Sequence, residues 1–135
     1  MTRVGALVVA AGRGSRMGGG TPKQYLPLGP WPILRHGLAR LAAHPRVHGV
    51  RAVIHPDDID LYRDAAEGLG LAEPVHGGAT RQESVRKGLD AFAGDGLDAV
   101  LIHDGARPFV DAGLIDRVLA RLETADGALP AIPVS

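Results

Sequence analysis

Residues 4–24 read VGALVVAAGRGSRMGGGTPKQ, an apolar run that opens into a glycine-rich loop. The apolar run suits a strand that is buried on both faces of a sheet. Five glycines between positions 12 and 20 let main-chain N–H groups approach an anion that side chains would otherwise block. Arg16 and Lys23 add positive charge to this loop. The stretch therefore predicts an α/β fold in which a buried strand delivers a phosphate-binding loop.

Two better-known glycine-rich loops are excluded by the residues around it. A dinucleotide fingerprint needs a third glycine where this chain has Met17, and an acidic residue about 20 positions later. Residues 1–56 contain no Asp or Glu, so a nicotinamide cofactor is not expected. A Walker loop is excluded because Lys23 follows Pro22 and precedes Gln24, where that motif needs Gly and then Ser or Thr.

The formal net charge of zero conceals a strong asymmetry. Residues 1–56 carry eight cations and no acid, whereas residues 57–135 carry seven cations and fifteen acids, which gives formal charges of +8 and −8. The two parts are therefore expected to attract each other. The cations of the first part are scattered through apolar periodic stretches with few aromatic residues, so nucleic-acid binding is not expected.

Length and composition indicate one globular domain over residues 1–135, with 45% hydrophobic and 22% charged residues. The absence of cysteine excludes disulfides, thiolate nucleophiles and sulfur metal sites, and it fits a reducing, cytoplasmic location. No apolar run approaches the ~20 residues of a membrane span and no signal sequence precedes the first strand, so no membrane association is expected.

Apolar runs alternate with helical periodicities along the chain. The expected strands are residues 4–9, 50–54, a short piece near 75, 99–102 and 128–134, and the expected helices are residues 33–44, 57–68, 81–92 and 112–122. The third helix should have an inner face of Val85, Leu89 and Phe92. N-terminal caps are expected from Asp57 or Asp58, from a capping box of Thr80 and Glu83, and from Asp111.

This order predicts a mostly parallel sheet with helices on both faces and right-handed crossovers, in which residues 99–102 form an interior strand. Ligands bind such sheets at the carboxyl ends of the strands. The segments 11–23, 77–84 and 103–108 all follow predicted strand ends, so they should converge on one crevice. The last predicted strand reaches Ser135 without a loop of its own, and we therefore expect the domain to be incomplete at its C-terminus.

The second of these segments joins Gly77 and Gly78 to a helix start. Its main-chain groups can recognise a base edge, and the helix N-terminus favours negative charge nearby. Arg81 and Ser84 are one turn apart and can point to the same place. The alternative is an ordinary capped helix with a glycine turn.

The third segment places an acid and a cation after a buried strand. Asp104 could hold ribose hydroxyls or a metal-bound water, because Mg²⁺ commonly uses one or two carboxylates together with substrate phosphates. The alternative is that Asp104 and Arg107 only form a structural salt bridge with each other. His103 is expected to be a buried, hydrogen-bonded histidine rather than a metal ligand or a base.

Four blocks of sequence together carry a resemblance to a known family. AAGRGSRM, PKQYLPLG, GGATRQESV and HDGARPFV, in this order, resemble the 2-C-methyl-D-erythritol 4-phosphate cytidylyltransferases of the non-mevalonate isoprenoid pathway, over nearly the whole chain. The first block alone marks only the wider nucleotidyltransferase superfamily. The resemblance implies a Rossmann-like nucleotidyltransferase fold. It also implies transfer of a cytidylyl group from CTP to methylerythritol phosphate, with pyrophosphate as the leaving group and Mg²⁺ as cofactor.

The same resemblance implies roles for particular residues. Arg16 and Lys23 match the residues that stabilise the transition state, and Arg107 lies on the substrate side. Asp104 also matches the metal side, where it would act directly or through water. The positions implied for nucleotide binding are Ala10, Ala11, Gly12, Gly14, Gly78, Arg81, Ser84, Asp104 and Gly105.

The resemblance also bears on partners and on alternatives. Family members continue beyond this chain with substrate-positioning residues and a dimerisation arm, so we expect a homodimer for the full-length protein and little activity for this part alone. Some members are fused to the cyclodiphosphate synthase of the same pathway. Three alternatives remain: another alditol-phosphate cytidylyltransferase, such as one for ribitol 5-phosphate; a molybdopterin nucleotidyltransferase, against which GGATRQESV speaks; and a nucleotide-binding module without catalysis.

Overall fold

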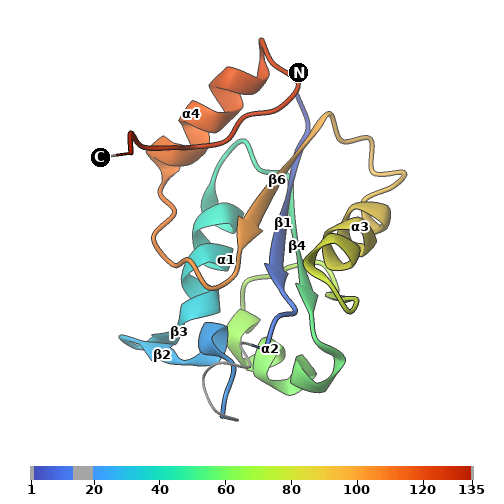
Figure 1. Cartoon of the computed structure of the whole chain (residues 1–135), viewed down its shortest axis with the longest axis vertical. Coiled ribbons are helices and arrows are strands. Elements are labelled where there is room, and N and C mark those ends of the chain that lie inside the picture. Colours follow the sequence, from blue (N-terminus) through green and yellow to red (C-terminus); the bar gives the residue numbers. More distant parts are fainter. Residues whose placement is uncertain (1, 14–19, 135) are drawn as a thin grey trace.

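The computed structural model describes residues 2–13 and 20–134 of the chain. Strands and helices alternate along it, as Figure 1 shows. The strands are β1 (Val4–Ala10), β2 (Pro27–Leu28), β3 (Trp31–Pro32), β4 (Gly49–Ile54), β5 (Val75–His76) and β6 (Ala99–Asp104). The helices are α1 (Ile33–Ala43), α2 (Ile59–Ala66), α3 (Arg81–Ala91) and α4 (Ala112–Leu122), with 3₁₀ turns η2 (Lys23–Tyr25) and η3 (Pro56–Asp58).

The main sheet is parallel, with the strand order β5-β4-β1-β6. β1 lies between β4 and β6, and its Val8 is in register with Ala52 on one side and His103 on the other. All seven residues of β1 are buried, as the unbroken apolar run predicted. The prediction of a parallel α/β sheet is confirmed, and all its strands end at the same edge.

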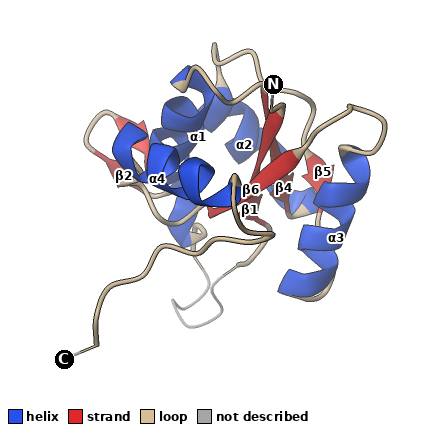
Figure 2. Ribbon diagram, turned by 90° about the horizontal axis from the view of Figure 1, so that it is seen from above, coloured by secondary structure: helices blue, strands red, loops and turns tan. Residues whose placement is uncertain are grey.

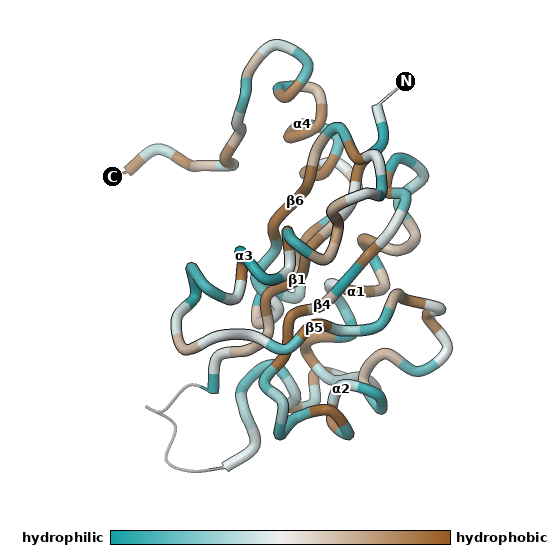
Figure 3. Tube along the Cα trace, turned by 90° about the vertical axis from the view of Figure 1, so that its right-hand side faces the viewer, coloured by the Kyte–Doolittle hydropathy of each residue, from teal (hydrophilic) through white to brown (hydrophobic). Residues whose placement is uncertain are grey.

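Helices cover both faces of this sheet. Figure 2 shows α1, α2 and α4 on one side of the strands and α3 on the other. Alternate residues of β1, such as Val8 and Ala10, join the larger core cluster with α1, α2 and α4, whereas Leu7 packs with Val53 and Phe92 near α3. The hydropathy of the trace agrees, because its most hydrophobic stretches run through the central strands (Figure 3).

The inner face of α3 differs from the prediction at one position. Val85 and Phe92 pack into the smaller core cluster, but Leu89 is 40% exposed. Gly88 is buried instead. It packs so closely on Leu7 of β1 that a side chain at this position would collide with the leucine methyl groups. Glycine has no apolar side chain, so the hydrophobic periodicity could not indicate that Gly88 faces the sheet. It assigned the neighbouring Leu89 to the inner face instead.

Two of the predicted helix caps are confirmed. Oγ1 of Thr80 accepts a hydrogen bond from the main-chain N–H of Glu83, and Oδ1 of Asp111 accepts one from Leu114 at the start of α4. The capping box is not reciprocal, however. Oε2 of Glu83 accepts from the N–H of Ala79, one residue before the cap.

The predicted cap of the second helix is wrong. Asp58 stands at the N-cap position of α2, but its side chain accepts no hydrogen bond from that helix. It binds Arg13 of the glycine-rich loop instead, at 2.6 Å. The helix also ends at Ala66 rather than near residue 68, because Glu67 adopts an extended conformation with ψ of 129°.

The prediction for the C-terminal segment is also wrong. Residues 128–134 form no strand, and Ile132 is 87% exposed. Pro130 and Pro133 lack two of the donors that a sheet ladder needs. β6, predicted as an interior strand, is consequently an edge strand of the described sheet, and its Ile102 is 48% exposed. Within residues 2–13 and 20–134, no helix is both long and apolar enough to cross a membrane.

Candidate functional site

A cleft of about 600 Å³ opens where β1, β4 and β6 end. Its volume lies within the range of small-molecule sites. Parts of all three segments that were predicted to converge line it. The lining residues are Val9, Ala10, Ala11, Gly12, Arg13, Lys23, Gln24, His55, Gly78, Ala79, Thr80, Arg81, Ser84, Asp104 and Ala106.

Gln24 stabilises the first wall of the cleft, which is formed by the end of β1 and the loop that follows it. The glutamine side chain is buried, and its Nε2 donates to the carbonyl oxygens of Ala10 and Gly12, both at 2.9 Å. Lys23 precedes it in η2 and has an exposed side chain at the cleft. Gln24 therefore fixes the turn that carries Lys23 to the end of β1. This role of Gln24 was not predicted, because its hydrogen-bond partners lie 12 and 14 positions away in the sequence and a single glutamine does not indicate them.

Two of the predicted residues of this loop, Gly14 and Arg16, lie outside the described residues. Arg13, which sequence reasoning did not select, lines the cleft and binds the buried Asp58 at 2.6 Å, with Asp57 at 3.9 Å. This contact joins the basic and acidic parts of the chain, as the charge asymmetry predicted. Because Arg13 is already paired, the cations left for a ligand among the described lining residues are Lys23 and Arg81.

In the second wall, the backbone at Gly77 packs closely against the end of β4, the loop after β1 and the start of α3. The N–H of Gly77 donates to Ile54 at the end of β4, at 2.8 Å. A Cβ atom at Gly77 would lie 2.5 Å from Cβ of Ala11 and 2.7 Å from Oγ of Ser84, so only glycine fits between the two loops. Gly77 is thus required for packing, whereas the sequence indicated only recognition of a base edge by main chain or a glycine turn.

Ser84 and Arg81 both line this wall but differ in exposure. Ser84 is buried, and its Oγ accepts from the N–H of Gly78 at 3.1 Å, whereas Arg81 is exposed. A Cβ atom at Gly78 would lie 2.5 Å from Oε2 of Glu83. The glycine turn and the start of α3 are therefore locked together, and Arg81 projects from the first turn of the helix.

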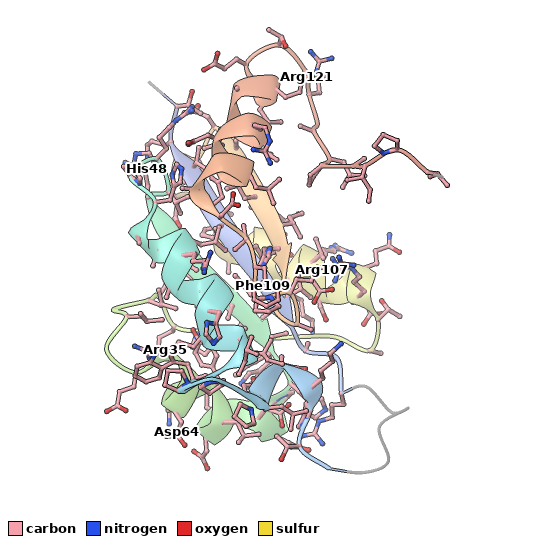
Figure 4. The ribbon with its side chains drawn as sticks, turned by 90° about the vertical axis from the view of Figure 1, so that its left-hand side faces the viewer. Arg35, His48, Asp64, Arg107, Phe109 and Arg121 are labelled. Carbon is pink, nitrogen blue, oxygen red and sulfur yellow. The ribbon has the colours of Figure 1, made fainter. Side chains whose placement is uncertain are left out.

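The third wall is the end of β6. Oδ1 of Asp104 accepts from the N–H of Ala106 at 3.1 Å, and Oδ2 lies 3.8 Å from Nε of Arg107. Arg107 has an 80% exposed side chain, so this ion pair is long and weak. Figure 4 places Arg107 and Phe109 near each other at this end of β6, with His48 and Arg121 toward the opposite end. Gly105 lies behind the cleft, where its N–H donates to Val9 at 2.9 Å.

The carboxylate of Asp104 suits a hard cation. Among the described lining residues it is the only acid, and its Oδ2 makes no hydrogen bond within the described part of the chain. Mg²⁺ is typically held by one or two carboxylates and by substrate phosphates, so this donor set fits it. Residues 2–13 and 20–134 contain no group of three or more histidine or acidic side chains that could hold a metal ion by themselves.

His103 is hydrogen-bonded, as expected, although it is half-buried. Its Nε2 lies 2.8 Å from the carbonyl oxygen of Arg107. Since a carbonyl oxygen can only accept, Nε2 carries the proton. Burial lowers the pKa of the His103 imidazole from its ordinary value, so the neutral form is favoured.

Among its described lining residues, the cleft combines the paired Arg13 with Lys23, Arg81, the N-terminus of α3 and the carboxylate of Asp104. Such groups bind and orient phosphates and neutralise their charge. Together with a parallel sheet whose ligand cleft lies at the strand ends, they are typical of the class of α/β proteins that bind nucleotides or phosphorylated substrates.

Comparison with known proteins identifies the family within that class. The profile of the family described as IspD, 2-C-methyl-D-erythritol 4-phosphate cytidylyltransferase, matches residues 4–135, and the chain belongs to this family. It is 60% identical to a bifunctional enzyme IspD/IspF of Rhodospirillum rubrum over its whole length. It is 55% identical to a 2-C-methyl-D-erythritol 4-phosphate cytidylyltransferase of Cereibacter sphaeroides over 96% of the chain.

A solved structure agrees with the sequence comparisons. The 4-diphosphocytidyl-2C-methyl-D-erythritol synthase of Anaerococcus prevotii superposes on 91% of the chain, with a TM-score of 0.75 and 26% identity, and the match covers 52% of that structure. The chain spans 35% of the bifunctional relative and 58% of the Cereibacter relative.

Proposed function

We propose that the complete protein transfers the cytidylyl group of CTP to 2-C-methyl-D-erythritol 4-phosphate and releases pyrophosphate. The observation that carries the proposal is the convergence of Lys23, Arg81 and Asp104 on one cleft at the strand ends, in a member of this family. The activity belongs to the complete protein, because the chain covers only part of its relatives.

The proposed reaction is a displacement at the α-phosphorus of CTP. An oxygen of the substrate phosphate attacks, a P–O bond forms, and the bond to the β-phosphate breaks so that pyrophosphate leaves with its electron pair. Lys23 would neutralise charge that grows on the reacting phosphates, together with Arg16 as the family resemblance implies. The hydrogen bonds of Gln24 hold the main chain next to Lys23 at the end of β1, and the lysine side chain would reach the phosphates from there.

The nucleoside would lie against the glycine-rich walls. Ala10, Ala11 and Gly78 present main chain with little side-chain bulk, which favours recognition of a pyrimidine base by backbone groups. Asp104 would hold Mg²⁺, which when bound supplies positive charge to the triphosphate. Arg107, outside the described cleft lining but one turn from Asp104, would face the second substrate.

We also propose that the complete protein is cytoplasmic and homodimeric. The cysteine-free composition is compatible with that location. A fused second enzyme is compatible with the comparisons, because a bifunctional enzyme matches the whole chain.

A panel of acceptors tests the proposed reaction. Pyrophosphate release by the full-length protein would be measured with CTP, Mg²⁺ and either methylerythritol phosphate or ribitol 5-phosphate. The proposal expects kcat/KM to be highest with methylerythritol phosphate. Preference for ribitol 5-phosphate would assign another alditol, and CTP binding without release for either acceptor would favour a binding module.

A further inference from the structure

We propose that His103 is a positioning residue for the substrate-side segment 104–110, and that one face of α1 is the support against which it holds this segment. The inference rests on the proposed function, in which Asp104 and Arg107 serve the metal and the second substrate. Neither residue is held in place by the other, since their side chains are 3.8 Å apart and Arg107 is exposed. Their placement must therefore come from the main chain between them.

The segment runs along α1 and contacts it at three places. Figure 1 shows the connection from β6 to α4 passing beside that helix. Leu34 packs behind Gly105, where a Cβ atom would lie 2.9 Å from Cδ1 of the leucine. Six residues further along α1, Nη1 of Arg40 donates to the carbonyl oxygen of Val110 at 3.1 Å. Positions 34, 37 and 40 share one face of a helix, so Gly37 lies between these two contacts.

The middle contact is the bond made by His103. Its Nε2–H donates to the carbonyl oxygen of Arg107 at 2.8 Å and closes a loop of five residues that contains Asp104. A Cβ atom at Gly37 would lie 3.1 Å from this Nε2 and 3.7 Å from the same carbonyl oxygen. The hydrogen bond therefore packs directly on α1 at Gly37. A larger residue at position 37 would require His103 or the helix to shift.

This arrangement links His103 to the reaction through geometry. Arg107 carries the carbonyl oxygen that His103 binds. Asp104 keeps the hydrogen bond from the N–H of Ala106, and Gly105 keeps its bond to Val9, so loss of the His103 bond would loosen mainly the Arg107 end of the turn. A displacement of about 1 Å in a group that positions a substrate costs up to about a hundredfold in rate. A histidine that only filled space would tolerate an apolar residue of similar size.

Four variants of the full-length protein test the inference. His103→Leu keeps a side chain of similar size but removes the hydrogen-bond donor. His103→Gln restores a donor, because its side-chain amide N–H can take the place of Nε2–H. Gly37→Ala presses on the bond from the helix side. Gly49→Ala is the matched control, because a Cβ atom there meets nothing within 4 Å. The readouts are kcat and KM for each substrate, the melting temperature and amide hydrogen exchange at residues 105–110.

The expected pattern separates positioning from general stability. In His103→Leu, kcat/KM for methylerythritol phosphate falls about tenfold or more, whereas KM for CTP changes less than about threefold. His103→Gln recovers most of that loss, and exchange at residues 105–110 rises only in His103→Leu and Gly37→Ala. Gly49→Ala behaves as wild type. If His103→Leu does not fold, the other two variants still test the inference. Gly37→Ala should then lower kcat/KM for methylerythritol phosphate, and His103→Gln should show near-normal kinetics.

Two results would overturn the inference. One is wild-type kinetics in both His103→Leu and Gly37→Ala, and the other is an equal rise of KM for both substrates that His103→Gln does not reverse. Failure of the proposed function itself is distinguishable, because wild-type protein would then release no pyrophosphate with methylerythritol phosphate, while hydrogen exchange would still report on the role of His103.

Discussion

The guanidinium of Arg13 and the buried carboxylate of Asp58 meet at 2.6 Å and join the start of the glycine-rich loop to the turn after β4. Removal of Arg13 would leave a charge buried without its partner. Water reaches the half-exposed arginine, so Arg13→Ala is expected to cost about 1–3 kcal/mol in free energy of unfolding, less than for a fully buried pair. Urea unfolding measures this loss. Arg86→Ala, at an exposed position of α3, is the control and should change stability little.

Gln24→Glu tests the clamp on the first wall. The substitution keeps the shape of the side chain but replaces the amide donor with an acceptor that faces the carbonyl oxygens of Ala10 and Gly12. We expect a loss of about 1–3 kcal/mol in free energy of unfolding and a lower kcat, because the turn that carries Lys23 shifts. Gln82→Glu, exposed on α3, makes the same chemical change away from the cleft. Similar losses in both variants would argue against a clamp.

Lys23→Ala in the full-length protein is expected to lower kcat by about a hundredfold or more, while KM for CTP changes much less. The reason is that the lysine would meet charge which grows only during transfer. Steady-state kinetics separates the two constants, and Lys87→Ala on the exposed surface of α3 is the matched control. An unchanged kcat with weak CTP binding would show that Lys23 binds only ground-state phosphate.

Tyr62 is one of two buried tyrosines, with Tyr25, whose raised phenol pKa lowers the stability of the fold at alkaline pH. Burial raises the pKa of the Tyr62 phenol to about 12, and the hydroxyl has no hydrogen-bond partner within the described part of the chain. The folded protein keeps this proton after the unfolded chain loses it near pH 10, so the contribution of Tyr62 to stability falls as the pH rises from about 10 toward about 12. Melting temperatures between pH 7 and 11 measure the loss.

Tyr62→Phe should melt at or above the wild-type temperature at pH 7, because it removes a buried hydroxyl without a partner. It should also lose less stability than wild type above pH 10. An identical alkaline decline in the two proteins would mean that Tyr62 does not control it.

Much of this fold followed from local patterns in the sequence. The unbroken apolar run of β1, Pro32 at the start of α1, and the caps of Thr80 and Asp111 each act within a few residues, so sequence alone could locate them. The order of strands and helices then placed the cleft at the strand ends. The three glycine-rich or charged segments could be assigned to that edge without coordinates.

What the sequence could not supply depends on contacts across long separations. Asp58 was predicted to cap its own helix, and only the folded chain shows that Arg13, 45 positions away, takes its carboxylate. Gly88 lies on the inner face of α3 because Leu7 approaches it, a fact that helical periodicity does not contain. The support that α1 gives to His103 is of the same kind, since Gly37 and His103 meet only after the sheet has formed.

Transfer of labelled phosphorus tests the central claim most directly. The full-length protein would be incubated with Mg²⁺, methylerythritol phosphate and CTP labelled at its α-phosphorus, and the products would be separated. The account predicts that the label moves into a cytidine diphosphate ester of methylerythritol in step with pyrophosphate release, and that Lys23→Ala suppresses both. Label that remained in CTP, or that appeared as CMP at the same rate with and without the acceptor, would contradict it.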